Sequence, residues 1–523
     1  MLRIPSLLAL LGVLVCAAEG RAQTTSNPFV SGMRWSEGAA VSLPWIPRRV
    51  TFAGHGQAVW AGRAVGNPGA TLYTGTDASS LAGTLDVPFV GAIGAVEVAA
   101  GAGFGELYSA VQFPGAGLGR VTEVTRTSAV QVPAALWTRT LAPEVAGGAK
   151  LVAGGGALFA ARHDVVAGKV WLDRLDPNDG HSLFAIQMPG AALRGLAVSN
   201  AGDRVALALG DRVAVFDGSG ASLASFGLPT SSEAFSLSGD GKTLVAGDMG
   251  LVHLWRDTGT GFQPAGSAMA GGNWLATRAA LSDDGLTLGV GWWDAKTGLS
   301  IRFHMWDLAG GTKLHDILQS GVFSSLQNFP EAVALSPDGQ RMAIGTWGSG
   351  GPDPQLMLFD RDLVQPVYST YLSGSVMALD LDDTGTRIAV ASKAGHANQF
   401  STTGYVQLFD TGERDLQIVG SVQTGAAFQL TSQLAGSTLS LFVFGTPLDP
   451  AAALSGVLGL SGIDPAQPFT VFGAPADPAG RADLHANVPA SPALIGFELR
   501  AQAVFLGALG LEFSREAPLV TVL

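Results

Sequence analysis

The chain has 523 residues and carries 30 Lys and Arg against 42 Asp and Glu, a net charge of -12. Binding to phosphate backbones needs clustered cations, so this acidic balance argues against a nucleic-acid partner. Hydrophobic residues make up 47% and charged residues 14%, and the 71 glycines are about twice the ordinary share of roughly 7%. Such a chain is too apolar for disorder and too rich in turns for a helical bundle. We therefore expect an all-β protein built from many short strands.

The first 22 residues have the layout of a secretory signal peptide. Arg3 is followed by an apolar stretch at 7–15 and by small residues that end at Ala22. The stretch is too short to cross a bilayer as a helix, which takes about 20 residues, and no later segment is apolar for long enough. We expect cleavage near Ala22, a secreted or periplasmic protein, and no transmembrane segment in the mature chain. Cys16 lies inside the signal, so the mature chain has no cysteine.

A unit of about 47 residues recurs after an N-terminal segment at 23–43. Each unit has an apolar strand, a turn rich in Ser, Asp and Gly, a second apolar strand, and a third strand that ends in an aromatic residue and Asp. Asp and Ser side chains bond their own backbone in such turns, and Gly supplies the positive φ. The clear turns lie at 199–202, 238–241, 282–285, 336–339 and 382–385, and weaker copies surround Gly56, Gly105 and Gly156. A period of 40 to 50 residues with four strands per unit is typical of a β-propeller.

These motifs resemble the WD40-like propeller class, including its exported bacterial members, over residues 44–424. The chain departs from strict WD40 repeats because the Gly-His pair that opens those repeats is not in place. The resemblance implies the fold and no particular partner. We expect eight blades, with seven as the alternative, because the first three units are degenerate.

The repeat stops before residue 425, and the last segment has a different pattern. Residues 425–523 are rich in Ala, Leu, Pro and Gly, with short alternating stretches between turns. This pattern predicts a small C-terminal β-sandwich. The segment resembles the C-terminal modules of large exported bacterial proteins.

No catalytic or metal-binding motif stands out. The eight histidines have no ligand spacing, and the mature chain offers no cysteine, so we expect neither a metal nor a cofactor. Two acidic turns, 176–180 and 380–385, partly match a calcium loop, but both fall where the repeat places a hairpin turn. Nucleophile elbows and phosphate loops are also missing. An enzyme is not excluded, but a non-enzyme is favoured.

The aromatic residues suggest a binding face. In a four-stranded blade the loops between second and third strands share one face with the connections between blades. The candidate binding residues on this face are Trp274, Trp292, Trp293, Trp347, Phe329, Arg278 and Asp294. Exposed rings beside hydrogen-bonding groups can stack on sugars or apolar side chains. Adjacent residues of a strand point to opposite sides, so at least one of Trp292 and Trp293 should face solvent or lie in a loop. The alternative is that the rings pack between blades.

Three functions compete at this point. The preferred one is an exported, non-catalytic binding or scaffold protein whose propeller presents aromatic residues to a glycan or protein partner. The second is an extracytoplasmic hydrolase or lyase with a polar site at the channel mouth, which rests on fold analogy. The third is a purely structural envelope protein.

Overall fold

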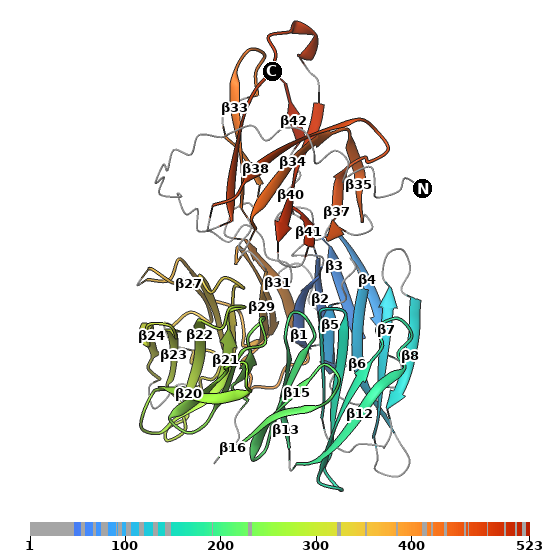
Figure 1. The fold of residues 1–523 in the computed structure, drawn as a ribbon. Coiled ribbons are helices and arrows are strands. Elements are labelled where there is room, and N and C mark those ends of the chain that lie inside the picture. The colour runs from blue at the N-terminus through green and yellow to red at the C-terminus, as the bar shows by residue number, and fades with distance from the viewer. Residues whose placement is uncertain are drawn as a thin grey trace. The chain divides into compact units, whose positions relative to one another are not determined.

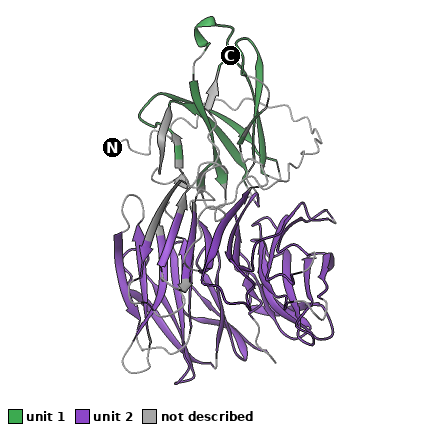
Figure 2. Ribbon diagram, turned by 180° about the vertical axis from the view of Figure 1, so that it is seen from behind, with its two compact units in different colours: residues 1–29, 413–523 green, residues 30–412 purple. Residues whose placement is uncertain are grey.

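The computed structural model describes residues 46–522 apart from short segments. The undescribed segments are 54–57, 66–68, 75–81, 90–91, 93–96, 101–105, 115–119, 129–133, 142–147, 191, 229–232, 322–325, 351–352, 364, 383–384, 411–415, 420–421, 434–436, 454–456, 459, 478–479, 496–497, 508–509 and 515–518. The predicted signal peptide and the segment 23–43 lie outside the described residues. Backbone contacts divide the chain into two compact units, one of which is residues 30–412 and the other of which contains residues 413–523 (Figure 2).

Unit 2 contains seven four-stranded antiparallel sheets and one three-stranded sheet, in chain order. The first four sheets are β1 (Ile46–Ala53), β2 (Ala58–Val65), β3 (Gly69–Thr74), β4 (Ala82–Pro88); β5 (Glu97–Ala100), β6 (Glu106–Pro114), β7 (Arg120–Ser128), β8 (Ala134–Leu141); β9 (Ala149–Gly154), β10 (Ala157–Asp164), β11 (Lys169–Leu175), β12 (Ser182–Pro189); and β13 (Leu193–Val198), β14 (Arg204–Leu209), β15 (Arg212–Asp217), β16 (Ser222–Gly227). The other four are β17 (Phe235–Leu237), β18 (Thr243–Gly247), β19 (Leu251–Asp257), β20 (Phe262–Met269); β21 (Trp274–Leu281), β22 (Thr287–Asp294), β23 (Ile301–Asp307), β24 (Thr312–Gln319); β25 (Pro330–Leu335), β26 (Arg341–Thr346), β27 (Leu356–Asp360), β28 (Tyr368–Thr370); and β29 (Val376–Leu381), β30 (Arg387–Lys393), β31 (Gly404–Asp410).

These sheets are the blades of a β-propeller, numbered 1 to 8 along the chain. The first strand of each blade contacts the first strand of the next, from β1 and β5 through to β25 and β29. β29 in turn contacts β1, which closes the ring (Figure 1). The predicted propeller is confirmed, and the eight blades expected from the repeat are present.

The two faces of the ring follow from this strand order. Turns that join first to second strands and third to fourth strands lie on one face, which we call the turn face. Loops that join second to third strands, and the connections between blades, lie on the other face, which we call the connection face.

The hydrophobic core is divided into one cluster for each pair of neighbouring blades. Blades 3 and 4 share a cluster that includes Phe159, whereas the adjacent Leu158 belongs to the cluster of blades 2 and 3. The same division continues round the ring and includes a cluster between blades 8 and 1. Both faces of a blade are thus buried, which explains why the second and third strands read as continuous apolar runs.

The repeated Ser/Asp/Gly turns are held by the bonds that their sequence predicts. In blade 7, Ser336 Oγ donates to Asp338 Oδ1 at 2.5 Å and accepts from the Arg341 N–H at 3.0 Å. Gly339 has a φ of +67°, which L side chains rarely adopt. The turns are also linked between blades, because the Asp283 N–H donates to the Pro337 carbonyl at 2.8 Å.

Unit 1 has two sheets around one core, as expected for a β-sandwich, and their strands are antiparallel except for one parallel pair. The sheets are β32 (Leu416–Val419), β33 (Ala427–Gln433), β39 (Arg481–Asn487); and β36 (Val457–Leu458), β41 (Gly510–Phe513), β40 (Glu498–Gly507), β34 (Leu439–Gly445), β38 (Phe469–Pro475), with β42 (Leu519–Thr521) on β40. A further pair is β35 (Pro447–Ala453) and β37 (Leu460–Ile463), and Pro492–Leu494 form the short 3-10 helix η2. Leu430 of the first sheet and Phe442 and Phe505 of the second share the core. In the described part of the chain, no helix is long and apolar enough to cross a membrane.

Candidate functional site

Trp292 is a core residue, and its place among the predicted binding residues is corrected by the structure. It lies in β22 with 0% of its surface exposed, in the cluster shared by blades 5 and 6. The adjacent Trp293 points to the other side of the blade and packs partly against the cluster of blades 6 and 7. Two consecutive tryptophans can both be largely buried here because each side of a blade is covered by a neighbouring blade.

Four other predicted residues come together on the connection face of blades 6 and 7. The Phe329 ring lies 4.9 Å from the Trp347 ring and 5.7 Å from the Trp293 ring, measured between centroids. The Arg278 guanidinium lies 5.7 Å from the centroid of Phe329, a cation–π distance. All four side chains are half-buried.

Glu331 of β25 fixes two members of this group. Its carboxylate accepts one hydrogen bond from Arg278 Nη2 and one from Trp347 Nε1, each at 2.9 Å. Its side chain is 13% exposed. Glu331 is not among the residues predicted from the sequence, because its position in the repeat does not indicate which groups its side chain reaches. We call Arg278, Trp293, Phe329, Glu331 and Trp347 the aromatic cluster.

Hydrogen bonds between the loops surround Phe329 and Trp347 of the aromatic cluster. Ser375 Oγ donates to the Trp347 carbonyl at 2.7 Å, and Asn328 Oδ1 accepts from the N–H groups of Phe329 and Gly348. His396 Nε2 lies 3.0 Å from the Gly348 carbonyl and its ring meets Trp347 edge-on. Loops of blades 7 and 8 are therefore tied together behind Trp347.

The remaining two predicted residues, Trp274 and Asp294, lie apart from the aromatic cluster. They are cross-strand partners at the end of the β21 and β22 pair. Arg302 lies 5.7 Å from the Trp274 ring. The Asp294 carboxylate is used by its own turn, where it accepts from Thr297 Oγ1 at 2.6 Å and from the Lys296 N–H at 2.9 Å. Asp294 thus has a turn-forming role.

A set of charged side chains lies near the connection-face ends of the first strands, and we call it the inner ring. Its members are Arg48 and Arg49 of blade 1, Glu97 of blade 2, Lys150 of blade 3, Arg194 of blade 4, Glu233 of blade 5, Arg278 of blade 6 and Glu331 of blade 7. In four first strands the pairing register shifts near these positions, as at Arg194 and Glu331. Such bulges re-aim side chains at the rims of closed sheets.

Ion pairs join members of the inner ring from blade to blade. Glu97 Oε1 lies 2.9 Å from Arg49 Nη2 and 3.5 Å from Lys150 Nζ, so it contacts the blades on both sides. Burial opposes ionisation of Glu97, but Arg49 and Lys150 outweigh it and lower the pKa of this carboxyl. Arg278 likewise contacts Glu233 at 2.8 Å and Glu331 at 2.9 Å.

Exposed apolar side chains are concentrated on the connection face. Among the described residues, six large ones lie in its loops: Val165, Val166, Met249, Leu326, Tyr371 and Phe400. The described loops of the turn face carry two, Leu286 and Leu363. Phe400 is 95% exposed and Tyr371 is 62% exposed. The connection face therefore exposes more apolar side chains in its loops and is the more favourable surface for association.

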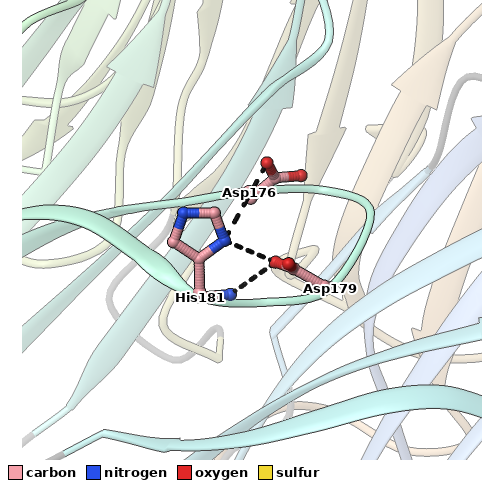
Figure 3. Close-up of side chains that lie close together, drawn as sticks. All are labelled: Asp176, Asp179 and His181. Atoms are coloured by element: carbon pink, nitrogen blue, oxygen red, sulfur yellow. Dashed lines mark hydrogen bonds and ion pairs between the residues drawn. The ribbon is translucent and has the colours of Figure 1, made fainter.

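One group in the described residues could present ligand atoms to a metal, namely Asp176, Asp179 and His181 in the β11–β12 turn (Figure 3). Asp179 Oδ1 already accepts from the His181 N–H at 2.9 Å, and the same oxygen lies 2.6 Å from His181 Nδ1. These bonds lower the pKa of Asp179. Asp176 Oδ1 accepts from the Asn178 N–H. The oxygens therefore build the turn, as the sequence suggested.

In the second acidic turn, the Asp382 carboxylate accepts from the Thr386 N–H at 2.8 Å and from the Arg387 N–H at 3.1 Å. This carboxylate is 1% exposed and serves the turn of blade 8.

The fold defines the chain as an eight-bladed β-propeller protein with a C-terminal β-sandwich. No family model matches the chain, and no curated protein matches it either. Among solved structures it is similar to the crystal structure of BamB from Moraxella catarrhalis, with 13% sequence identity and a TM-score of 0.46. The match covers 69% of this chain and 96% of the other.

Proposed function

We propose that the protein is a non-catalytic binding or scaffold protein that docks a protein partner on the connection face of its propeller. The observation that carries this proposal is the distribution of exposed apolar side chains in the described loops, six on the connection face against two on the turn face. Apolar surface gains free energy when a partner covers it, by about 25 cal/mol for each Å². A face with this excess is the expected site of association.

A protein fits this face better than a polysaccharide. A sugar needs a flat ring that is open on one side. In the aromatic cluster, Arg278 lies over Phe329, and Trp347 uses its N–H on Glu331. The fully exposed ring, Phe400, is an apolar anchor of the type that protein interfaces bury.

Export and the WD40-like nature of the repeats belong to the same proposal. Residues 1–22 support a secreted or periplasmic location, and the turn motifs support the resemblance to WD40-like repeats. In this proposal the C-terminal sandwich serves attachment or spacing.

The inner ring gives no support to the alternative of a hydrolase or lyase. A general acid needs a carboxyl whose pKa is raised. The pKa of Glu97 is lowered by Arg49 and Lys150. Burial does raise the pKa of Asp353, which lies in the β26–β27 loop. If the protein were a hydrolase with Asp353 as its general acid, the Asp353→Asn variant would be expected to lose activity.

Site-specific crosslinking tests the docking face. We expect a benzophenone side chain at Phe400 or Tyr371 to form an adduct with a polypeptide in cells that export the protein. The matched control is Leu363, a 48% exposed residue of the turn face. Equal labelling at Leu363, or adducts that resist protease and are removed by glycosidases, would contradict a protein partner on the connection face.

Replacing tryptophans separates binding from folding. Trp347→Ala should weaken the Phe400 adduct while the protein stays folded, because Trp347 is half-buried on the connection face. Trp292→Ala should cost about 3–5 kcal/mol of unfolding free energy, since it leaves a large cavity between blades 5 and 6. Denaturant unfolding of both variants checks this order, and a larger loss for Trp347→Ala would show that Trp347 is mainly a packing residue.

A further inference from the structure

We propose that the inner ring receives a partner segment that carries acidic and basic side chains at separate positions. The acidic part would face Arg49 and Lys150, and the basic part would face Glu233 and Glu331. This inference rests on the proposed protein-binding function and adds the chemistry of the segment that enters the ring.

The inner ring contains two groups of three charged side chains, and the signs of the charges in one group are the reverse of those in the other. Blades 1 to 3 contribute Arg49, Glu97 and Lys150, in which two cations share one carboxylate. Blades 5 to 7 contribute Glu233, Arg278 and Glu331, in which two carboxylates share one guanidinium. Each triad keeps one charge in excess, positive in the first and negative in the second.

The three side chains of each triad differ in how far they are exposed to solvent. In the first triad Arg49 and Lys150 are 38% and 30% exposed, and the central Glu97 is 11% exposed. In the second triad Glu233 is 54% exposed, against 21% for Arg278 and 13% for Glu331. On each side, therefore, the group most open to solvent belongs to the sign that is in excess.

Positive and negative side chains predominate on different blades of the ring. Blades 1 to 4 carry Arg48, Arg49, Lys150 and Arg194 against Glu97, and blades 5 to 7 have a negative excess. Like charges placed side by side repel, and an external ligand with the complementary arrangement relieves this repulsion.

The two triads interact electrostatically across the ring. The pKa of Arg49 is raised mainly by Glu97, and Glu331 and Glu233 of the opposite triad add to this effect. The two halves therefore share one electrostatic field. A segment with opposite charges at its two ends would be both attracted and oriented by that field.

Labelled peptides test this charge pattern. The probe has three glutamates at one end and three lysines at the other, joined by a Gly-Ser linker, and its control is a peptide of the same composition with the charges alternating. We expect fluorescence anisotropy to show at least about tenfold tighter binding of the segregated peptide, and loss of this difference near 0.5 M salt. Equal binding of the two peptides, or no binding up to about 1 mM, overturns the proposal.

Charge reversals locate the site. Lys150→Glu and Glu233→Lys should each weaken binding of the segregated peptide about tenfold. Lys242→Glu and Asp362→Lys make the same changes at exposed positions of the turn face and should have no effect. Thermal unfolding confirms that all four variants are folded. If neither ring variant weakens binding, the inner ring is not the site.

Failure of this inference can be told apart from failure of the docking proposal. If the Phe400 crosslink forms with a protein but the peptides do not discriminate, the connection face docks a partner without using the ring charges. If the crosslink also fails, the docking proposal itself is wrong.

Discussion

At the scale of single residues, burial decides which of the many polar and aromatic side chains are free to act. Trp292 and His304 lie in blade 6 with 0% exposure, their rings 5.7 Å apart. Trp347, 55 positions beyond Trp292 in the sequence, is half-buried on the connection face. The residue type is the same in Trp292 and Trp347, and only the surroundings separate a packing residue from a surface one.

The buried His304 predicts a pH-dependent stability. Burial lowers its pKa from 6.5 to about 4, although Asp316, 3.3 Å away, favours the protonated form. The unfolded chain therefore binds a proton between these pH values that the folded chain does not. Stability from this residue is full above pH 6.5 and is lost as the pH falls towards 4, by at most about 3 kcal/mol.

Denaturant unfolding at several pH values between 7 and 4.5 measures this effect. We expect His304→Gln to lose less stability than the wild type over this range. His181→Gln serves as the control because the His181 side chain is 54% exposed. If the wild type and His304→Gln lose stability in parallel, His304 does not titrate as its burial implies.

At the scale of elements, the Ser/Asp/Gly turn has both a local and a long-range role. Gly339 needs its positive φ for the turn, and a Cβ at this position would also lie 2.4 Å from Thr287 Oγ1 on the neighbouring blade. The sequence predicted the first requirement through the turn motif. It could not predict the second, because the distance to the next blade depends on how the blades pack.

Two glycine variants separate these roles. Gly339→Ala should cost about 2 kcal/mol or more, since a left-handed backbone and a clash both act. Gly311→Ala should cost less unfolding free energy. Gly311 has a similar φ of +64°, but a Cβ added at this position would have no atom within 4 Å. Urea unfolding compares the two, and equal losses would mean that neighbouring turns separate without cost.

At the scale of the whole molecule, ring closure is the junction with no covalent support. Seven junctions join blades that are consecutive in the chain, but blade 8 meets blade 1 through noncovalent contacts between β29 and β1. The Phe52 N–H of β1 donates to Asp380 Oδ2 of β29 at 2.9 Å. The equivalent bond between blades 5 and 6 runs from the Leu281 N–H to Ser236 Oγ at 3.2 Å.

We expect Asp380→Ala to open the ring more readily than Ser236→Ala. Loss of the acceptor should cost about 1–3 kcal/mol and expose β1 and β30 together, because no chain link holds blades 1 and 8. Hydrogen exchange of these strands measures the effect. Ser236→Ala leaves blades 5 and 6 joined by the chain and should leave β1 protected. Similar exchange of β1 in both variants would argue that closure depends on the apolar cluster between blades 8 and 1 alone.

The sequence by itself determined the all-β class, the repeat and the turn chemistry, because each depends on residues close together in the chain. It favoured eight blades, with seven as the alternative. It also placed Arg278, Trp293, Phe329 and Trp347 on one face. The tertiary structure alone decided that Trp292 is core and that Glu331 holds Arg278 and Trp347. It alone assembled the inner ring, because those charges come from seven blades and meet only when the ring closes. Local patterns fix the blades, and closure fixes which side chains remain at the surface and which charges become neighbours.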